Sequence, residues 1–198
     1  MKTEVKIGNQ VWMSENLNVE RFRNGAPIHE AKTNEEWQMA GENKQAAWCY
    51  YDNDPVNGAI YGKLYNWYAV IDPRGLAPEG WQIPGNDEWT RLADVSGKEY
   101  TIFGGSKVVG AKMKSNSGWA NNGNGTNETG FSGLPGRNRF IDGTFYDLCG
   151  CGFWWSSSEA STKGALARAI AYSDETYDLL QINKCNGFSV RCLRGLFI

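Results

Sequence analysis

Residues 152–159 read GFWWSSSE, an aromatic stretch that ends in small polar residues, and three comparable stretches follow it along the chain. They are ALARAIAYS at 165–173, TYDLLQIN at 176–183 and GFSVRCLRG at 187–195. Each is short, contains closely spaced apolar or aromatic residues, and is bounded by polar residues typical of turns, which is the pattern of β-strands. The C-terminal third is therefore predicted to form an antiparallel sheet.

Three segments upstream carry helix signals. Residues 33–37, TNEEW, form a capping box, in which a threonine and a glutamate satisfy backbone amides of the first turn. Residues 61–72, YGKLYNWYAVID, space their apolar residues as a helix does and end before a proline. Residues 85–97, GNDEWTRLADVSG, predict a further helix that begins at Gly85 or Asn86. The residues expected on its inner face are Trp89, Leu92 and Val95.

The rest of the chain adds two strands and a long loop. Residues 5–13, VKIGNQVWM, alternate well enough for one opening strand, and residues 47–54, AWCYYDND, read as a strand that ends in a polar loop. Residues 104–136 are rich in glycine, asparagine and serine and show little periodicity, which predicts a long ordered loop. This order of elements predicts a single α+β domain over residues 1–198.

The composition excludes several classes of protein. The formal net charge is −2 with both signs mixed along the chain, so no binding to nucleic acid is expected. No apolar run is long enough to cross a bilayer, and the first residues lack the apolar core of a signal peptide, so no membrane insertion is expected. The chain has nine tryptophans and 24 glycines, which indicates short secondary-structure elements joined by ordered loops around an aromatic core.

Six ordered motifs resemble one family. They are IGNQVWMSENLN, YGKLYNWYAV, LAPEGWQIPGNDEW, TNETGFSGLPG, WWSSSE and GFSVRCLRG, and the resemblance that they carry extends over roughly residues 4–195. They resemble the Fibrobacter succinogenes major paralogous domain of Bacteroidetes and Fibrobacteres. The resemblance implies a C-type-lectin-like fold, related to the formylglycine-generating enzymes, with two main helices, a small twisted antiparallel sheet and long ordered loops. One departure is Gly85, where the family often has a threonine or serine as helix cap.

Nucleophilic catalysis finds little support in the sequence. A serine nucleophile needs a positioned base, and the only imidazole is His29, in a polar segment where a solvated histidine is the expected reading. Ser156, Ser157 and Ser158 are therefore expected to bond to backbone near the end of a strand. No phosphate-binding loop or dinucleotide fingerprint is present, and the chain is not expected to be an enzyme.

Metal and redox chemistry are also weakly indicated. Cys149-Gly-Cys151 is too tight for the usual zinc spacing, and the pair does not match the cysteine context of the formylglycine-generating enzymes. Cys49 and Cys192 lie in apolar surroundings and could form a disulfide or two packed thiols. No cofactor is expected. Calcium is conceivable at polar loops whose oxygen ligands would be Asp52, Asp54, Asn57 and residues 121–127.

A different signal lies in residues 140–185, which resemble the variable region of diversity-generating retroelement target proteins. Such retroelements randomise adenines, mostly in AAY codons, which cannot become codons for Trp, Met, Gln, Lys or Glu. Along the predicted strands, family-like residues alternate with positions of no common character, and a strand points such alternate residues to opposite faces. All the miscellaneous positions obey the codon rule: Phe140, Ile141, Asp142, Thr144, Tyr146, Asp147, Cys149, Cys151, Phe153, Ala160, Ser161, Ala167, Ala169, Ala171, Ser173 and Asp174.

The resemblance implies a binding module. Those side chains would form one exposed surface that recognises a protein or glycan ligand, as paratopes do. The scaffold beneath them would be built from Trp12, Trp67, Trp81, Trp89 and Trp154. Display on a cell surface, pilus or phage particle, with a possible oligomer, is the expected setting. The alternatives are a formylglycine-generating-type oxidoreductase and a purely structural surface domain.

Overall fold

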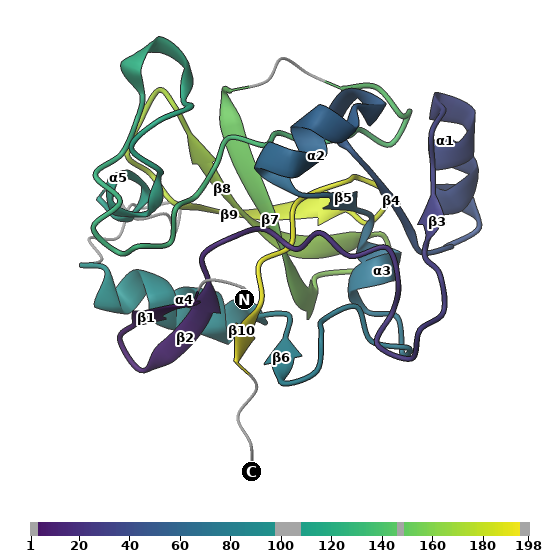
Figure 1. Ribbon diagram of the computed structural model, residues 1–198, viewed down its shortest axis with the longest axis horizontal. Helices are drawn as coiled ribbons and strands as arrows, with labels where there is room; N and C mark the ends of the chain where they lie inside the picture. The colour runs from purple at the N-terminus through teal and green to yellow at the C-terminus, as the bar shows by residue number, and fades with distance from the viewer. Residues whose placement is uncertain (1–3, 98–107, 146–148, 195–198) are drawn as a thin grey trace.

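The stretch at residues 152–159 lies in β7 (Cys151–Glu159), which pairs antiparallel with β8 (Gly164–Ala171). β8 in turn pairs antiparallel with β9 (Asp178–Asn183), so β8 is the central strand of three. The structure is a computed structural model that describes residues 4–97, 108–145 and 149–194. Figure 1 shows this sheet in the middle of the molecule with helices around it. The antiparallel sheet predicted for the C-terminal third is present.

The two ends of the described chain meet in a second sheet. Its strand order is β1 (Glu4–Ile7), β2 (Gln10–Met13), β10 (Leu193–Arg194) and β6 (Trp81–Gln82). The single opening strand predicted from the sequence is wrong, because the chain reverses at Gly8, whose φ of 59° is readily adopted by glycine. The result is a hairpin with a two-residue loop.

A third sheet consists of β3 (His29–Glu30), β4 (Ala47–Cys49) and β5 (Leu64–Tyr65), with β3 and β4 parallel. Residues 187–194 join this sheet to the central one. The backbone of Phe188 exchanges hydrogen bonds with Tyr65 of β5, at 2.9 and 3.1 Å. The next residue, Ser189, bonds to the backbone of β7 on its other side. The segment predicted as a strand is therefore extended along most of its length, although only its end forms a regular strand.

The helices are short. They are α1 (Asn34–Glu42), α2 (Pro55–Tyr61), α3 (Trp67–Val70), α4 (Asn86–Val95) and α5 (Val109–Met113), with 3₁₀ turns η1 (Tyr51–Asn53) and η2 (Ala120–Asn122). The capping box predicted at Thr33 is confirmed, since its hydroxyl accepts from Glu36 N at 3.2 Å and the Glu36 carboxylate accepts from Thr33 N. The helix predicted over residues 61–72 is wrong. Leu64 and Tyr65 pair in β5, and Asn66 caps the single turn of α3.

The helix predicted from Gly85 is confirmed as α4, with a cap assembled from two segments. Gly85 has no side chain to accept a hydrogen bond, and Ser158 Oγ on β7 accepts from Asn86 N at 2.9 Å instead. Trp89 and Leu92 face inward as predicted, whereas Val95 is exposed at the end of the helix. A serine distant in sequence thus supplies the cap that the local sequence lacks.

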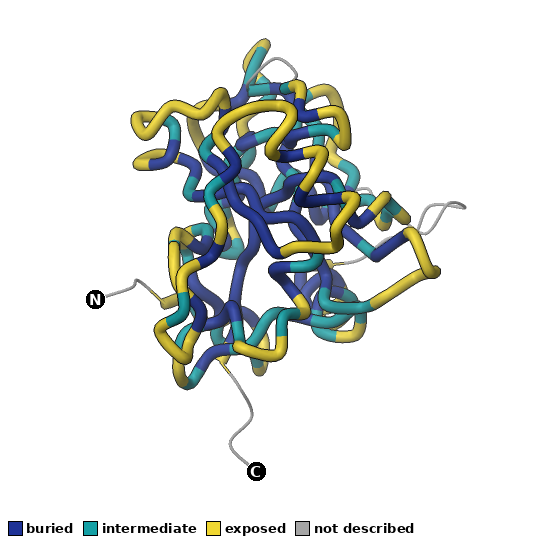
Figure 2. The backbone as a smooth tube through the Cα atoms, turned by 90° about the vertical axis from the view of Figure 1, so that its right-hand side faces the viewer, coloured by how far each residue is buried: buried dark blue, intermediate teal, exposed yellow. Residues whose placement is uncertain are grey.

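The core lies on both faces of the central sheet. One cluster contains Trp155 and Phe188, and the other contains Trp154 and Ile170. Figure 2 shows the buried backbone in the interior and the exposed segments around it. The scaffold tryptophans predicted from the sequence are all buried: Trp12, Trp67, Trp81, Trp89 and Trp154. Because apolar side chains cover both faces, β7 and β8 present little free sheet surface.

Candidate functional site

The residues predicted to form one binding surface are divided between the two ends of the central sheet. Cys151 and Ala171 are paired at one end of the β7–β8 ladder. Ala160 and Ser161 lie in the turn at the other end, beyond Glu159. At about 3.3 Å per residue, the nine residues of β7 separate these two groups by roughly 26 Å. The predicted residues therefore do not form one compact cluster.

The residues predicted to bind ligand also differ in how far they are buried. Ile141, Asp142, Thr144, Ala160, Ser161, Ser173 and Asp174 are exposed, and Phe140, Cys149, Cys151, Phe153 and Ala171 are half-buried. Tyr146 and Asp147 lie outside the described residues. Ala167 and Ala169 are buried, which corrects their assignment to the surface. The physical reason is that β8 is central and has a hydrophobic cluster on each face, so residues in the middle of the strand are shielded from solvent.

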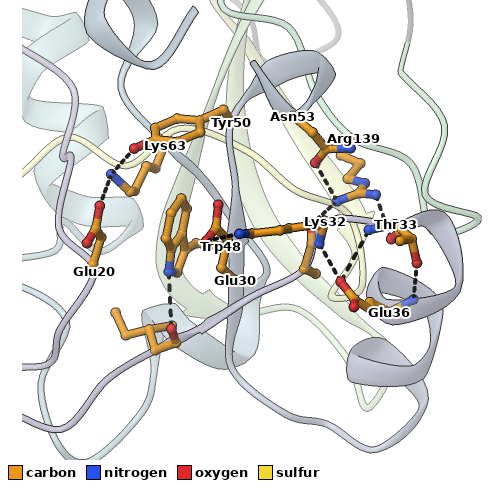
Figure 3. Close-up of polar contacts among 12 residues, drawn as sticks. Glu20, Glu30, Lys32, Thr33, Glu36, Trp48, Tyr50, Asn53, Lys63 and Arg139 are labelled. Atoms are coloured by element: carbon orange, nitrogen blue, oxygen red, sulfur yellow. Dashed lines mark hydrogen bonds and ion pairs between the residues drawn. The ribbon is translucent and has the colours of Figure 1, made fainter. Parts of the chain in front are cut away.

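The exposed loop at residues 140–144 is held by Arg139, whose relative exposure is 0%. The guanidinium donates to three carbonyl oxygens: Ala31 O at 2.7 Å, Thr33 O at 2.8 Å and Gly143 O at 2.9 Å. Figure 3 shows Arg139 reaching the start of α1 at Thr33 and the η1 turn. One buried side chain thus ties the loop to two other parts of the fold.

Further contacts make the loop rigid. The guanidinium of Arg139 lies 4.9 Å from the ring centroid of Trp37 and 4.9 Å from that of Phe145. Within the loop, Phe140 N donates to Thr144 O at 2.9 Å. The Asp142 carboxylate accepts from the backbone and hydroxyl of Thr144 at 3.0 and 2.7 Å, and these bonds lower its pKa. Ile141 is left 49% exposed at the tip.

A hollow of about 290 Å³ lies beside this loop. Its lining comes from α1, from the loop and from the end of β9: Gln38, Glu42, Ile141, Asp142, Asn183 and Cys185. Gln38 Nε2 donates to Asp142 O at 2.9 Å and closes one side of the hollow. Four of these residues were not predicted to bind ligand, because they come from segments that only the fold brings together. The site can offer an apolar side chain, two carboxylates and two amides to a ligand.

A larger hollow of about 450 Å³ lies between residues 14–18 and α2. At its wall, Asn16 Oδ1 accepts from Trp154 Nε1 at 2.9 Å and from Arg191 Nη2 at 2.7 Å. Its amide nitrogen donates to Tyr61 O at 2.8 Å, so the side chain of Asn16 is fully used in holding the fold. This hollow contains none of the residues predicted to bind ligand.

None of the five cysteines forms a disulfide in the structure. Of the two alternatives for Cys49 and Cys192, the structure has packed thiols, since both are buried and neither forms a disulfide. Burial raises the pKa of the Cys151 thiol and that of Cys185, which favours the unreactive protonated form. Cys149 adopts a φ of 69° and its Sγ lies 3.8 Å from the Tyr61 hydroxyl.

The serines bond mainly to backbone, as predicted. Ser157 Oγ donates to Ile83 O at 3.3 Å, Ser158 Oγ accepts from Asn86 N, and Ser156 Oγ accepts from Ser158 N at 3.1 Å. His29 is exposed in β3. Within the described ranges, no group of three or more His, Cys, Asp or Glu residues is placed to hold a metal ion. No described helix is long and apolar enough to cross a membrane.

Comparison with known proteins agrees with the motifs. The family model of the Fibrobacter succinogenes major domain matches residues 5–194. The chain belongs to this family. No curated protein and no solved structure is significantly similar to it. In this Fibrobacter succinogenes major domain, the family match spans both ends of the terminal sheet and the loop held by Arg139.

Proposed function

We propose that this Fibrobacter succinogenes major domain is a binding module, and that the surface around residues 140–144 recognises a protein or glycan ligand. The observation that carries the proposal is the pairing of exposed side chains with a rigid backbone at this loop. Ile141, Asp142 and Thr144 face solvent, while Arg139 fixes the chain beneath them through three carbonyl oxygens. A preorganised loop loses little conformational entropy on binding, so more of its contact energy contributes to affinity.

The hollow beside the loop supplies the shape that such recognition needs. Ile141 offers apolar contact area, and the amides of Gln38 and Asn183 can hydrogen-bond to sugar hydroxyls or peptide groups. The carboxylates of Glu42 and Asp142 make the rim acidic, which favours neutral or cationic ligands over anionic ones. A chain displayed on a cell, pilus or phage surface would present this rim to another surface.

The proposal also includes a C-type-lectin-like fold and the diversification of residues 140–185 by a retroelement. A C-type-lectin-like fold is supported by the paired terminal strands, by the two longest helices, α1 and α4, and by the long loops. Diversification by a retroelement is supported by the exposure of residues 141, 142, 144, 173 and 174. It requires a nearby template repeat in the gene that differs from the coding of residues 140–185 at adenines. A locus without such a repeat rules diversification out and leaves the binding proposal standing.

The binding proposal is tested with matched isoleucine variants. The domain is screened against a glycan array and against a displayed peptide library, and any ligand found is titrated against Ile141→Asp and Ile71→Asp. Both isoleucines are similarly exposed, at 49% and 47%, but only Ile141 borders the hollow. We expect Ile141→Asp to weaken binding by at least tenfold and Ile71→Asp to leave it unchanged. Equal effects of the two substitutions would place the site elsewhere.

An oxidoreductase of the formylglycine-generating type is the second candidate, because Cys149 and Cys151 lie close in sequence near the start of β7 and both are half-buried. Copper-dependent substrate oxidation that is lost in a Cys149→Ser, Cys151→Ser double variant would establish that activity. If neither the glycan array nor the peptide library yields a ligand, and no turnover is detected, we conclude that this is a purely structural surface domain.

A further inference from the structure

Lys63 is a buried lysine that faces a side-chain amide and a carboxylate. Its side chain is 3% exposed, although it carries an ammonium group immediately before β5. Lys63 Nζ lies 2.5 Å from Asn18 Oδ1 and 3.3 Å from a Glu20 carboxylate oxygen. The first distance is short for a nitrogen–oxygen hydrogen bond, whose usual range begins near 2.7 Å. The amine is thus pressed against the amide group of Asn18.

Aromatic rings form the wall behind the amine. Lys63 Nζ lies 4.4 Å from the ring centroid of Trp48 and 4.6 Å from that of Tyr50, and the Tyr50 hydroxyl is 3.2 Å away. Figure 3 shows the lysine between Glu20 and Tyr50, beside Trp48. These rings exclude water from the buried side of the amine, whereas Glu20, 61% exposed, lies at the open side.

Backbone and side-chain bonds fix both reacting residues. Lys63 N donates to Leu17 O at 3.2 Å, which ties the lysine to the residue before Asn18. The amide nitrogen of Asn18 donates to Gly58 O at 3.4 Å, which orients the amide. The two groups are therefore held together by the fold and not by their mutual contact alone. Such positioning gives intramolecular reactions very high effective concentrations.

We propose that Lys63 and Asn18 form an intramolecular isopeptide bond. Glu20 accepts a proton from the Lys63 ammonium, and the neutral amine moves from the amide oxygen to the adjacent carbon, Cγ. A bond forms between Lys63 Nζ and Asn18 Cγ, the bond between Cγ and Nδ2 breaks, and Glu20 returns the proton to the departing nitrogen. The attacking nitrogen also loses a second proton, which Glu20 passes to the departing group in the same way, so the products are a secondary amide and one ammonium ion, and neither an oxidant nor a cofactor takes part. The ammonium ion leaves through the exposed side where Glu20 lies.

Two other buried lysines lack this arrangement and serve as controls. Lys114 Nζ donates to the backbone carbonyls of Ala171 and Asp174, at 3.2 and 2.9 Å. Lys184 Nζ bonds to the Glu159 carboxylate and to Thr162 O. Neither is shown contacting a side-chain amide, so neither can release ammonia by the same route. Burial and aromatic contact alone do not distinguish Lys63, whereas the amide and the carboxylate together do.

The consequence would be a covalent ring that closes between residues 18 and 63. It would join the segment after β2 to β5, and so tie two of the three sheets together. A ring that constrains the unfolded chain raises stability in the way a disulfide does, and it resists reducing agents. We expect the wild-type protein to unfold at a higher temperature than Lys63→Arg, with the difference unaffected by dithiothreitol.

Mass spectrometry of the intact chain and of its protease digest tests the proposal. We expect the wild-type protein to be lighter than its sequence mass by one ammonia, and its digest to contain a branched peptide that joins Lys63 to Asn18. Lys63→Arg should restore the full mass, Lys114→Arg should keep the loss, and Glu20→Gln should slow bond formation during refolding. A digest of wild-type protein, incubated at alkaline pH, that still contains only unlinked peptides overturns the proposal. So does a branched peptide that involves a different lysine.

Discussion

Replacing Ala167 by tyrosine tests whether the proposed diversified surface can extend into β8. Tyrosine is one of the outcomes that an AAY codon allows, so a randomised position should tolerate it. The structure places Ala167 at 0% exposure, opposite Trp155 of β7 on one side and Leu180 of β9 on the other. Its methyl group belongs to the hydrophobic cluster that contains Phe188. No space exists there for a phenol ring without displacing these neighbours.

The size of the effect follows from two terms. Overpacking a well-filled core costs about 1–3 kcal/mol. A buried hydroxyl without a partner adds about 1–3 kcal/mol. The sum of roughly 2–6 kcal/mol is a large part of the roughly 5–15 kcal/mol by which domains are usually stable. For a chain of this length it corresponds to a fall in melting temperature of about 5–20 °C.

The measurement is urea unfolding followed by tryptophan fluorescence, with Ala160→Tyr as the matched control. Ala160 is exposed in the turn after β7, so the same substitution there should change stability by less than about 0.5 kcal/mol. The slope of the transition should be similar in both variants, because the surface exposed on unfolding is similar. If Ala167→Tyr is as stable as Ala160→Tyr, the burial of β8 is wrong and the diversified surface includes this strand.

Three further outcomes are expected. Ser158→Ala removes the acceptor for Asn86 N at the start of α4 and should lower stability by about 1 kcal/mol in thermal unfolding, with Ser158→Thr retaining most of it. Gly152→Ala should lower stability by about 1–3 kcal/mol, because the added Cβ would lie 2.7 Å from Leu134 O; a wild-type melting temperature would contradict this contact. Burial raises the pKa of Cys49 to about 12, above its ordinary value of 9.0, so the folded state binds more protons than the unfolded state in that window. The resulting stability is fully present below pH 9 and is lost as the pH rises toward 12, and Cys49→Ala should flatten that slope in unfolding titrations.

Local chemistry made part of the fold predictable. The capping box at Thr33 depends on residues three positions apart, and α1 begins where that motif places it. The helix predicted over residues 61–72 was wrong, because the local pattern did not decide the structure there. Its apolar spacing is helical, yet Tyr65 pairs with β4 and with Phe188, residues that lie far away in the sequence. Backbone hydrogen bonds to distant segments outweighed a weak local preference for helix.

The candidate site was predictable only in part for a related reason. Alternation along a strand indicates which residues share a face, and it correctly separated Trp154 from Phe153. It carries no information about what covers each face, and at Ala167 that cover is a second layer of core. The hollow beside Ile141 was invisible in the sequence, since its lining comes from a helix, a loop and the end of a strand.

By itself, the sequence determined the family, the antiparallel character of the C-terminal third, the starts of α1 and α4 and the tryptophan core, because each of these depends on short-range patterns of residue type. The tertiary structure alone decided which predicted surface residues reach solvent. It also decided that Arg139 would hold the exposed loop and that Lys63 would meet Asn18. Those outcomes depend on close contacts between segments tens of residues apart, and only the packed chain brings such segments together.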